Sequence, residues 1–141
     1  MQVRDIMSTD VITVGADATL ADATTRLLDA GVGSVMVVED GEPVGILTES
    51  DILQAARETG RALGEIEVRD VGHRPVVTTS PLTAATTVAR LMADEEVKKV
   101  PVLDGVDLVG IVTLTDIVWA LPSLRAETAA IKAVRDEWSP R

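Results

Sequence analysis

The chain has 141 residues, of which 46% are hydrophobic, and its formal net charge is −10 at pH 7. This length suits one modest core, because two independent units of about 60 residues would each be marginally stable. The negative charge argues against direct binding to nucleic acid, whose affinity depends on Lys and Arg contacts to phosphate. The absence of Cys excludes disulfides and thiolate metal sites.

The acidity has two interpretations that the sequence leaves open, a soluble surface or adaptation to a cytoplasm of high salt concentration. We find no basic leader followed by an apolar core, and no apolar run as long as a membrane span. The sequence therefore predicts a soluble, cytoplasmic protein without membrane association. The sole histidine, His73, precedes an expected strand, and we interpret it as a solvated or locally bonded loop residue.

An internal repeat is the main feature of the chain. The segment VGILTESDI (Val44 to Ile52) recurs as VGIVTLTDI (Val109 to Ile117), and the offset between the copies is constant, since 110 − 45 and 116 − 51 both equal 65. Val3-Arg4-Asp5 and Val68-Arg69-Asp70 have the same offset. A repeat of this kind indicates one supersecondary unit used twice, with the copies sharing a core.

The elements follow the same order in each copy. Short β-branched runs at 11–14 and 76–79 predict entry strands. Apolar residues spaced by three and four predict a helix after Asp17, and in the second copy Ser80 and Pro81 are predicted to be its N-cap and first residue. Buried strands at 35–38 and 100–103, hairpin partners at 44–47 and 109–112, and helices from Thr48 and Thr113 complete the units.

After the first unit, Gly60 is expected to end a helix, and Pro122 is expected to interrupt the chain before a last amphipathic helix. That helix could fold back on its own chain or dock on another. We therefore predict an α+β (mixed α/β) fold of two β-α-β-β-α units with pseudo-twofold symmetry. Its expected parts are repeat one over 1–60, repeat two over 61–121 and the C-terminal helix over 122–141.

The duplicated Gly-hydrophobic-x-Thr-x-x-Asp motif, with the Val-Pro-Val strand before its second copy, resembles the CBS domain, named from cystathionine β-synthase. Tandem CBS domains form a Bateman module, and the resemblance covers about Val3 to Trp119. In that family the paired sheets enclose two clefts that typically bind adenosine-containing ligands. The resemblance implies that Asp51 and Asp116 accept hydrogen bonds from ribose hydroxyls, with Thr48 and Thr113 near ribose or phosphate.

Other candidate residues follow from the same resemblance, namely Thr13 and Thr78 near the base and Met36 and Pro101 beside its apolar slot. Lys98 and Lys99 match positions where nucleotide-sensing relatives, such as the gamma subunit of AMP-activated protein kinase, direct basic side chains to phosphates. Repeat one has Gly33 and Ser34 there, so the clefts are expected to differ, and we expect the cleft of Asp116 to be preferred.

Each Thr-x-x-Asp also has a purely structural interpretation. A helix-capping box places Thr at the N-cap and an acidic or amide side chain three residues later. The bare motif is compatible with either role, and one carboxylate could serve both. The occurrence of the motif in two copies, within matching sequence context, is what favours ligand binding.

No Ser/His/Asp arrangement, Walker phosphate loop or metal-ligand spacing is evident, so we expect neither catalytic residues nor a metal. The sequence predicts a regulatory module that needs no cofactor and binds an adenine nucleotide, NAD or S-adenosylmethionine as regulatory ligand. It would signal to an unidentified partner protein and form a homodimer. The alternative is a ligand-free scaffold for protein interactions.

Overall fold

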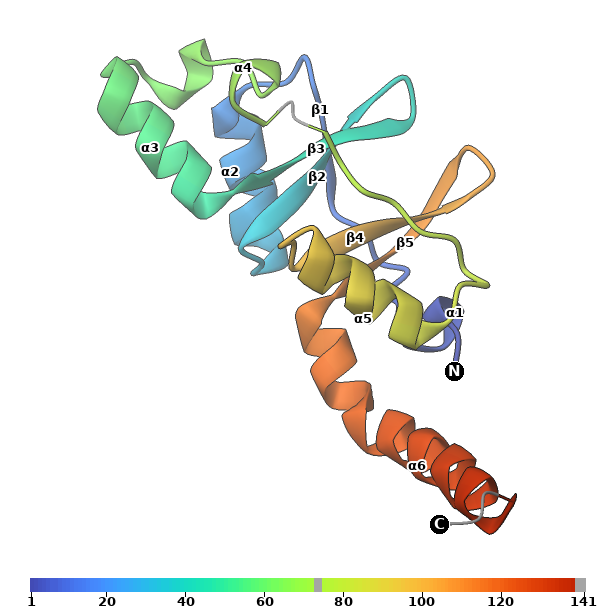
Figure 1. The fold of residues 1–141 in the computed structure, drawn as a ribbon. Helices are drawn as coiled ribbons and strands as arrows, with labels where there is room; N and C mark the ends of the chain where they lie inside the picture. Colours follow the sequence, from blue (N-terminus) through green and yellow to red (C-terminus); the bar gives the residue numbers. More distant parts are fainter. Residues whose placement is uncertain (73–74, 139–141) are drawn as a thin grey trace.

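A computed structural model describes residues 1–72 and 75–138, with side chains up to Glu127; His73 and Arg74 lie outside the described residues. The chain forms two small sheets with helices packed around them (Figure 1). The first sheet has strand order β1-β2-β3, and the second pairs β4 with β5. The strands are β1 (Thr13–Gly15), β2 (Ser34–Glu39), β3 (Glu42–Thr48), β4 (Lys99–Asp104) and β5 (Asp107–Thr113).

Helix α2 (Leu20–Ala30) follows the predicted apolar spacing. Leu20, Ala23 and Leu27 are buried on one face. Thr19 caps the helix, since its side chain accepts from the Asp22 backbone N–H at 3.2 Å while the Asp22 carboxylate accepts from the Thr19 N–H at 3.0 Å. The hydrogen bond from the Thr19 backbone N–H to this carboxylate, with the bond to the Thr19 side chain, lowers the pKa of Asp22.

The two hairpins have the same structure, as the internal repeat predicts. Strands β2 and β3 pair antiparallel from Ser34 opposite Thr48, and β4 and β5 repeat that register from Lys99 opposite Thr113. Each hairpin has an irregularity one or two residues before its turn. The predicted hairpin strands therefore form in both copies.

The entry strands differ, and here the sequence-based expectation holds for only one copy. β1 pairs parallel with β2, and the Met36 N–H donates to the Ile12 carbonyl at 2.9 Å. In repeat two, the predicted strand over 76–79 is reduced to a single bridge between Thr79 and Val102. The counterpart of Met36 is Pro101, which has no N–H to donate, so one ladder bond cannot form.

The start of the second unit's first helix was predicted wrongly. α5 (Ala85–Asp94) begins after Ala84, which has no side-chain cap. Ser80, the predicted cap, instead places its hydroxyl 3.2 Å from that of Thr83 in the preceding turn. The Ser-Pro pair therefore shapes a loop rather than the helix start.

The first segment of each repeat packs against the other repeat. The short helix α1 (Val3–Ile6) contacts α5 and α6, with the Val3 N–H donating to the Thr83 carbonyl at 2.8 Å. Its counterpart α4 (Arg69–Gly72) packs on repeat one, where the Val68 N–H donates to the Ala18 carbonyl at 2.8 Å. The exchange joins the two repeats into one body, because Val3 is buried in the core of repeat two and Val68 in that of repeat one.

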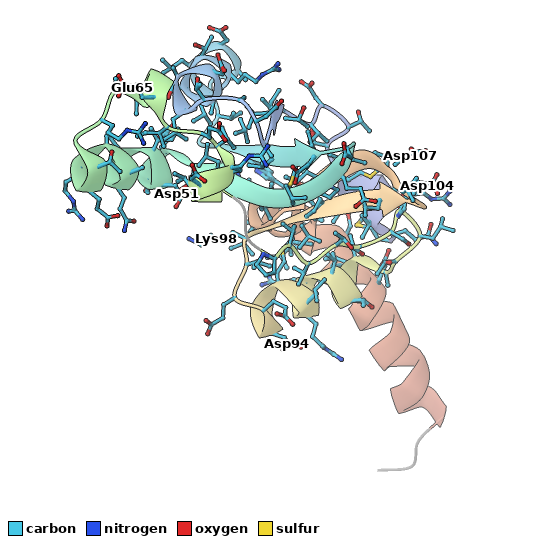
Figure 2. All side chains as sticks on the ribbon, turned by 90° about the horizontal axis from the view of Figure 1, so that it is seen from above. Asp51, Glu65, Asp94, Lys98, Asp104 and Asp107 are labelled. Atoms are coloured by element: carbon cyan, nitrogen blue, oxygen red, sulfur yellow. The ribbon has the colours of Figure 1, made fainter. Side chains whose placement is uncertain are left out.

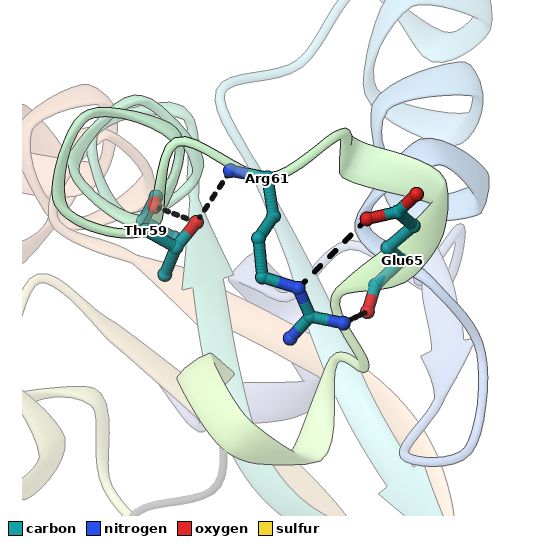
Figure 3. Close-up of polar contacts among 4 residues, drawn as sticks. Thr59, Arg61 and Glu65 are labelled. Atoms are coloured by element: carbon teal, nitrogen blue, oxygen red, sulfur yellow. Dashed lines mark hydrogen bonds and ion pairs between the residues drawn. The ribbon is translucent and has the colours of Figure 1, made fainter.

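Helix α3 (Glu49–Thr59) ends at Gly60, as predicted, in a left-handed conformation with φ of 64°. The connection to repeat two is held against this helix end (Figure 3). The Arg61 N–H donates to the Thr59 hydroxyl at 3.1 Å, and the Arg61 guanidinium donates to the Glu65 carbonyl at 2.6 Å. Glu65 ends the 3-10 helix η1 (Leu63–Glu65), so the linker is ordered by its own side chains.

The last helix is longer than predicted. α6 (Leu114–Trp138) runs from the second motif through Pro122 without interruption and extends away from both sheets (Figure 1). A proline inside a helix removes one backbone hydrogen bond without necessarily ending the helix. The predicted apolar stripe of the last helix includes Thr128, Ile131, Val134 and Trp138, whose side chains lie outside the described ones. No described helix meets the length and hydropathy needed to cross a membrane.

Candidate functional site

The two Thr-x-x-Asp motifs are both helix-capping boxes. The Asp51 carboxylate accepts from the Thr48 N–H at 2.9 Å, and the Asp51 N–H donates to the Thr48 hydroxyl at 3.1 Å. The corresponding distances for Thr113 and Asp116 are 2.8 Å and 3.2 Å. The caps hold each aspartate at the start of a helix directly after a hairpin strand. The structural interpretation of the motifs is thus confirmed.

A cavity of about 420 Å³ lies between the repeats and contains the first of these motifs. Thr48 and Asp51 supply its polar part from repeat one, while the remaining wall comes mainly from repeat two. Ile46 and three valines give the cavity an apolar slot, and its lining also holds two carboxylates and two ammonium groups. The lining residues are Ile46, Thr48, Asp51, Pro75, Val76, Val77, Glu96, Val97, Lys98 and Lys99.

The two lysines have different environments. Lys98 is exposed, whereas Lys99 is half-buried, and burial lowers the pKa of its ammonium group. The Lys99 ammonium donates to the hydroxyl of Ser34, which is its counterpart in repeat one. Ser34 and Lys99 therefore meet where the two repeats face each other. Lys99 can also reach an anionic group in the cavity, because it lines the cavity wall.

The lysine pair, which was expected at the cleft of Asp116, lies beside both motifs. Both lysines line the cavity of Thr48 and Asp51, and Figure 2 shows Asp51 and Lys98 at the same side of the molecule. They also line a second hollow of about 400 Å³ with Thr113. Asp116 is not among the described residues lining either one. The repeats face each other, so the start of β4 adjoins the motif of the opposite repeat.

The other predicted residues lie outside the cavity lining. Met36 and Pro101 are fully buried core residues at equivalent strand positions. Thr13 lies in β1 opposite Met36, and Thr78 is exposed beside the lining residue Val77. Their predicted contacts with a base remain predictions.

Sequence reasoning missed most of the apolar lining and one charged residue. Ile46, Val76 and Val77 lie in the predicted strands 44–47 and 76–79, and neither Val97 nor Glu96 was among the predicted site residues. The duplicated frame could have located them, because residues around the entry segment and the start of the next strand face the opposite motif. Within the described part of the chain, no cluster of His, Cys, Asp or Glu is suited to hold a metal ion.

Comparison with known proteins places this site in context. The family model of the CBS domain matches twice, over residues 3–58 and 68–123, which together make up well over half of the chain. The chain belongs to the CBS-domain family. The two matches correspond to the two duplicated units, so the molecule is a CBS-domain pair, and members of this kind act as regulatory ligand-binding modules.

Relatives are found in bacteria and archaea. The chain is 34% identical over 115 residues to the CBS domain-containing protein YhcV of Bacillus subtilis, covering 82% of this chain and 81% of YhcV. It is 32% identical over 128 residues to the uncharacterized protein MK0525 of Methanopyrus kandleri, covering 89% of this chain but 65% of that protein. The chain thus spans less than two thirds of MK0525.

A solved structure with bound ligands has the same fold. The CBS-domain pair of protein MJ0100, in complex with 5′-methylthioadenosine and S-adenosyl-L-methionine, matches with a TM-score of 0.74 and 26% identity. The match covers 87% of this chain and 97% of that one. Some CBS-domain pairs of this fold therefore bind adenosyl compounds.

Proposed function

We propose that this CBS-domain pair binds an adenosine-containing ligand in the cavity of Asp51 and regulates a partner protein through a change in shape or association. The observation that carries the proposal is the cavity itself, in which Thr48 and Asp51 of one repeat meet apolar residues and two lysines of the other. AMP, ADP, ATP, NAD and S-adenosylmethionine are the candidate ligands. The ligand-bearing relative MJ0100 supports the adenosyl class.

Each part of an adenosyl ligand has a suitable counterpart. A carboxylate offers two acceptor oxygens to a vicinal diol, and the cap uses Oδ2 of Asp51 for the Thr48 N–H. Ile46, Val76 and Val97 offer an apolar wall for a base. Lys98 and Lys99 offer positive charge to a phosphate or carboxylate, in a protein whose net charge is −10.

The cavity also suggests how a ligand would act. Its walls come from both repeats, and each repeat additionally holds the first segment of the other. A ligand that binds better to one relative placement of the repeats shifts the equilibrium toward it by its differential affinity. We propose that this shift is the output, received by a partner in a cytoplasmic, non-enzymatic role.

A homodimer is proposed from the exposed apolar residues of α3 and α6. Leu53 is 71% exposed and its counterpart Val118 is 55% exposed, while Trp119 next to it is 81% exposed. Equivalent positions on both repeats thus present apolar groups. The same residues support a second candidate function, a ligand-free scaffold for protein interactions.

Isothermal titration with the five candidate ligands tests the main proposal. We expect binding to the natural sequence, and a loss of at least tenfold in Asp51→Asn, whose amide oxygen can still cap the helix but which offers one acceptor fewer to ribose. Asp116→Asn is the matched control, because Asp116 forms the same capping box away from the cavity lining. Equal binding by both variants would refute the site.

Thermal shifts separate the ligand-binding module from the scaffold. A ligand present at 100 times its dissociation constant should stabilise the native state by about 2.7 kcal/mol. If no adenosyl compound binds below millimolar concentration and none raises the Tm, the scaffold is the better description. In that case Trp119→Ala should still disrupt self-association measured by light scattering.

A further inference from the structure

Glu96 has an unusual backbone conformation for its residue type. Its φ is 54°, in the left-handed region, and its counterpart in repeat one is Gly31 with φ of 66°. The helix ends are otherwise alike, since the Val32 N–H donates to the Leu27 carbonyl at 3.1 Å and the Val97 N–H to the Met92 carbonyl at 3.0 Å. A glycine would therefore suit position 96, as it does position 31.

Turn chemistry does not explain the glutamate. Among residues 1–72 and 75–138, the other non-glycine residue with positive φ is Asp40, in the β2–β3 turn, and Asp is among the types that tolerate this region. Glu lacks the short side chain that makes this conformation tolerable for Asp and Asn. Strained residues of this kind occur preferentially at functional sites.

The side chain of Glu96 lies at such a site. Glu96 lines the cavity with Lys98, Lys99 and Asp51, and among the described residues it forms no ion pair. Lys98 also forms none. The Asp51 carboxylate already accepts the Thr48 N–H, so Glu96 is the acidic group of the lining most available to a ligand beside the lysines.

Building on the proposed function, we propose that Glu96 is a specificity-determining residue of this cavity. Its carboxylate selects an adenosyl ligand that carries a cationic group beside an anionic one, and it disfavours ligands that carry phosphates alone. The lysines bind the anionic group and Glu96 the cationic group, so the cavity is complementary to a zwitterion. The repulsion of pure anions adds to the selectivity.

Isothermal titration with three probes of matched adenosyl core tests this role. S-adenosylmethionine carries positive groups and a carboxylate, 5′-methylthioadenosine carries no charge, and AMP carries only negative charge. In Glu96→Gln we expect S-adenosylmethionine to bind about three- to tenfold more weakly, 5′-methylthioadenosine to change less than twofold, and AMP to bind more tightly. Glu95→Gln is the control, because Glu95 is adjacent but does not line the cavity.

Stability of the ligand-free protein provides the second readout. Glu96→Gly should raise the Tm by about 2 °C, because it relieves the backbone at a left-handed position, while it weakens S-adenosylmethionine as Glu96→Gln does. A Tm that does not rise, or an equal change for all three probes, would overturn the proposal for Glu96 alone. If no probe binds the natural sequence, the proposed function fails and this role fails with it.

Discussion

The two repeats share a frame but differ at the positions that face the other repeat. Both have the same hairpin register and the same capping box at the second helix. By contrast, repeat one has small residues at the start of β2, and repeat two has two lysines at the start of β4. The shared frame thus fixes the fold, and the lysine pair is a chemical difference that can give one cavity its own ligand preference.

We expect the largest loss in free energy of unfolding where the first segment of one repeat, such as α1 and the residues after it, packs against the other repeat. A Cβ at Gly110 would lie 2.8 Å from the Met7 sulfur and 2.9 Å from the Ser8 carbonyl oxygen. Because one of these atoms is backbone that is itself hydrogen-bonded to Ile111, Gly110→Ala should destabilise the protein by about 3 kcal/mol in urea unfolding.

Two other glycines serve as comparisons for this variant. At Gly72, in the exchanged helix α4, a Cβ would meet side-chain carbons of Val37 and Leu47 at 3.0 Å and 3.3 Å, so Gly72→Ala should cost less. At Gly64 a Cβ would meet nothing within 4 Å, and Gly64→Ala should be close to neutral. A neutral Gly110→Ala would mean that the exchanged segment contributes little.

Replacing the lysine pair of repeat two by the Gly-Ser pair of repeat one should remove the positive charge that distinguishes the two repeats. In Lys98→Gly with Lys99→Ser, AMP should bind about tenfold more weakly, while adenosine should change less than twofold, because only the phosphate needs the positive charge. Titration calorimetry at low salt would measure both. Equal losses for the two ligands would show that the lysines shape the cavity but do not contact phosphate.

The sequence predicted the frame well, because β-branched runs, apolar residues at helical spacing and Thr-x-x-Asp caps are local patterns. The hairpins, α2 and the end of α3 at Gly60 followed from such patterns. The errors arose where one residue changes the backbone chemistry between copies. Pro101 shortens the entry strand of repeat two, and Pro122 is accommodated inside α6.

The candidate site was only partly predictable, since its composition depends on which repeat supplies each wall. Thr48 and Asp51 were found from the motif, and Lys98 and Lys99 from their difference from Gly33 and Ser34. Their combination in one cavity was not found, because sequence distance pairs the lysines with Asp116. The proximity of the lysines to Asp51 depends on how the two repeats face each other, which only the three-dimensional structure shows.

The first helices of the two repeats offer a smaller test of the same comparison. Thr19 caps α2 and Ala84 leaves α5 uncapped, although Ala84 has an extended backbone with φ of −62° and ψ of 139°. Thr19→Ala should therefore destabilise the protein by about 1 kcal/mol, and Ala84→Asp should stabilise it by roughly half that. Urea unfolding checks both, and opposite signs are the expected result.

The smallest expected effect concerns the contact between Ser34 and Lys99, where the repeats meet. Burial lowers the pKa of Lys99, so between its folded pKa and the ordinary lysine value near 10.5 the unfolded chain binds more protons than the native one. The penalty for the buried charge is therefore fully present below the folded pKa and disappears as pH rises through this window.

Replacing the charge should reveal that penalty. Lys99→Met should be more stable than the natural sequence near neutral pH, by about 2 °C in Tm, and its advantage should shrink as the pH approaches 10. Lys98→Met, at the exposed neighbour, is the matched control for the change of a lysine to methionine. An advantage of Lys99→Met that stays constant with pH would mean that the gain comes from apolar packing and not from the removed charge.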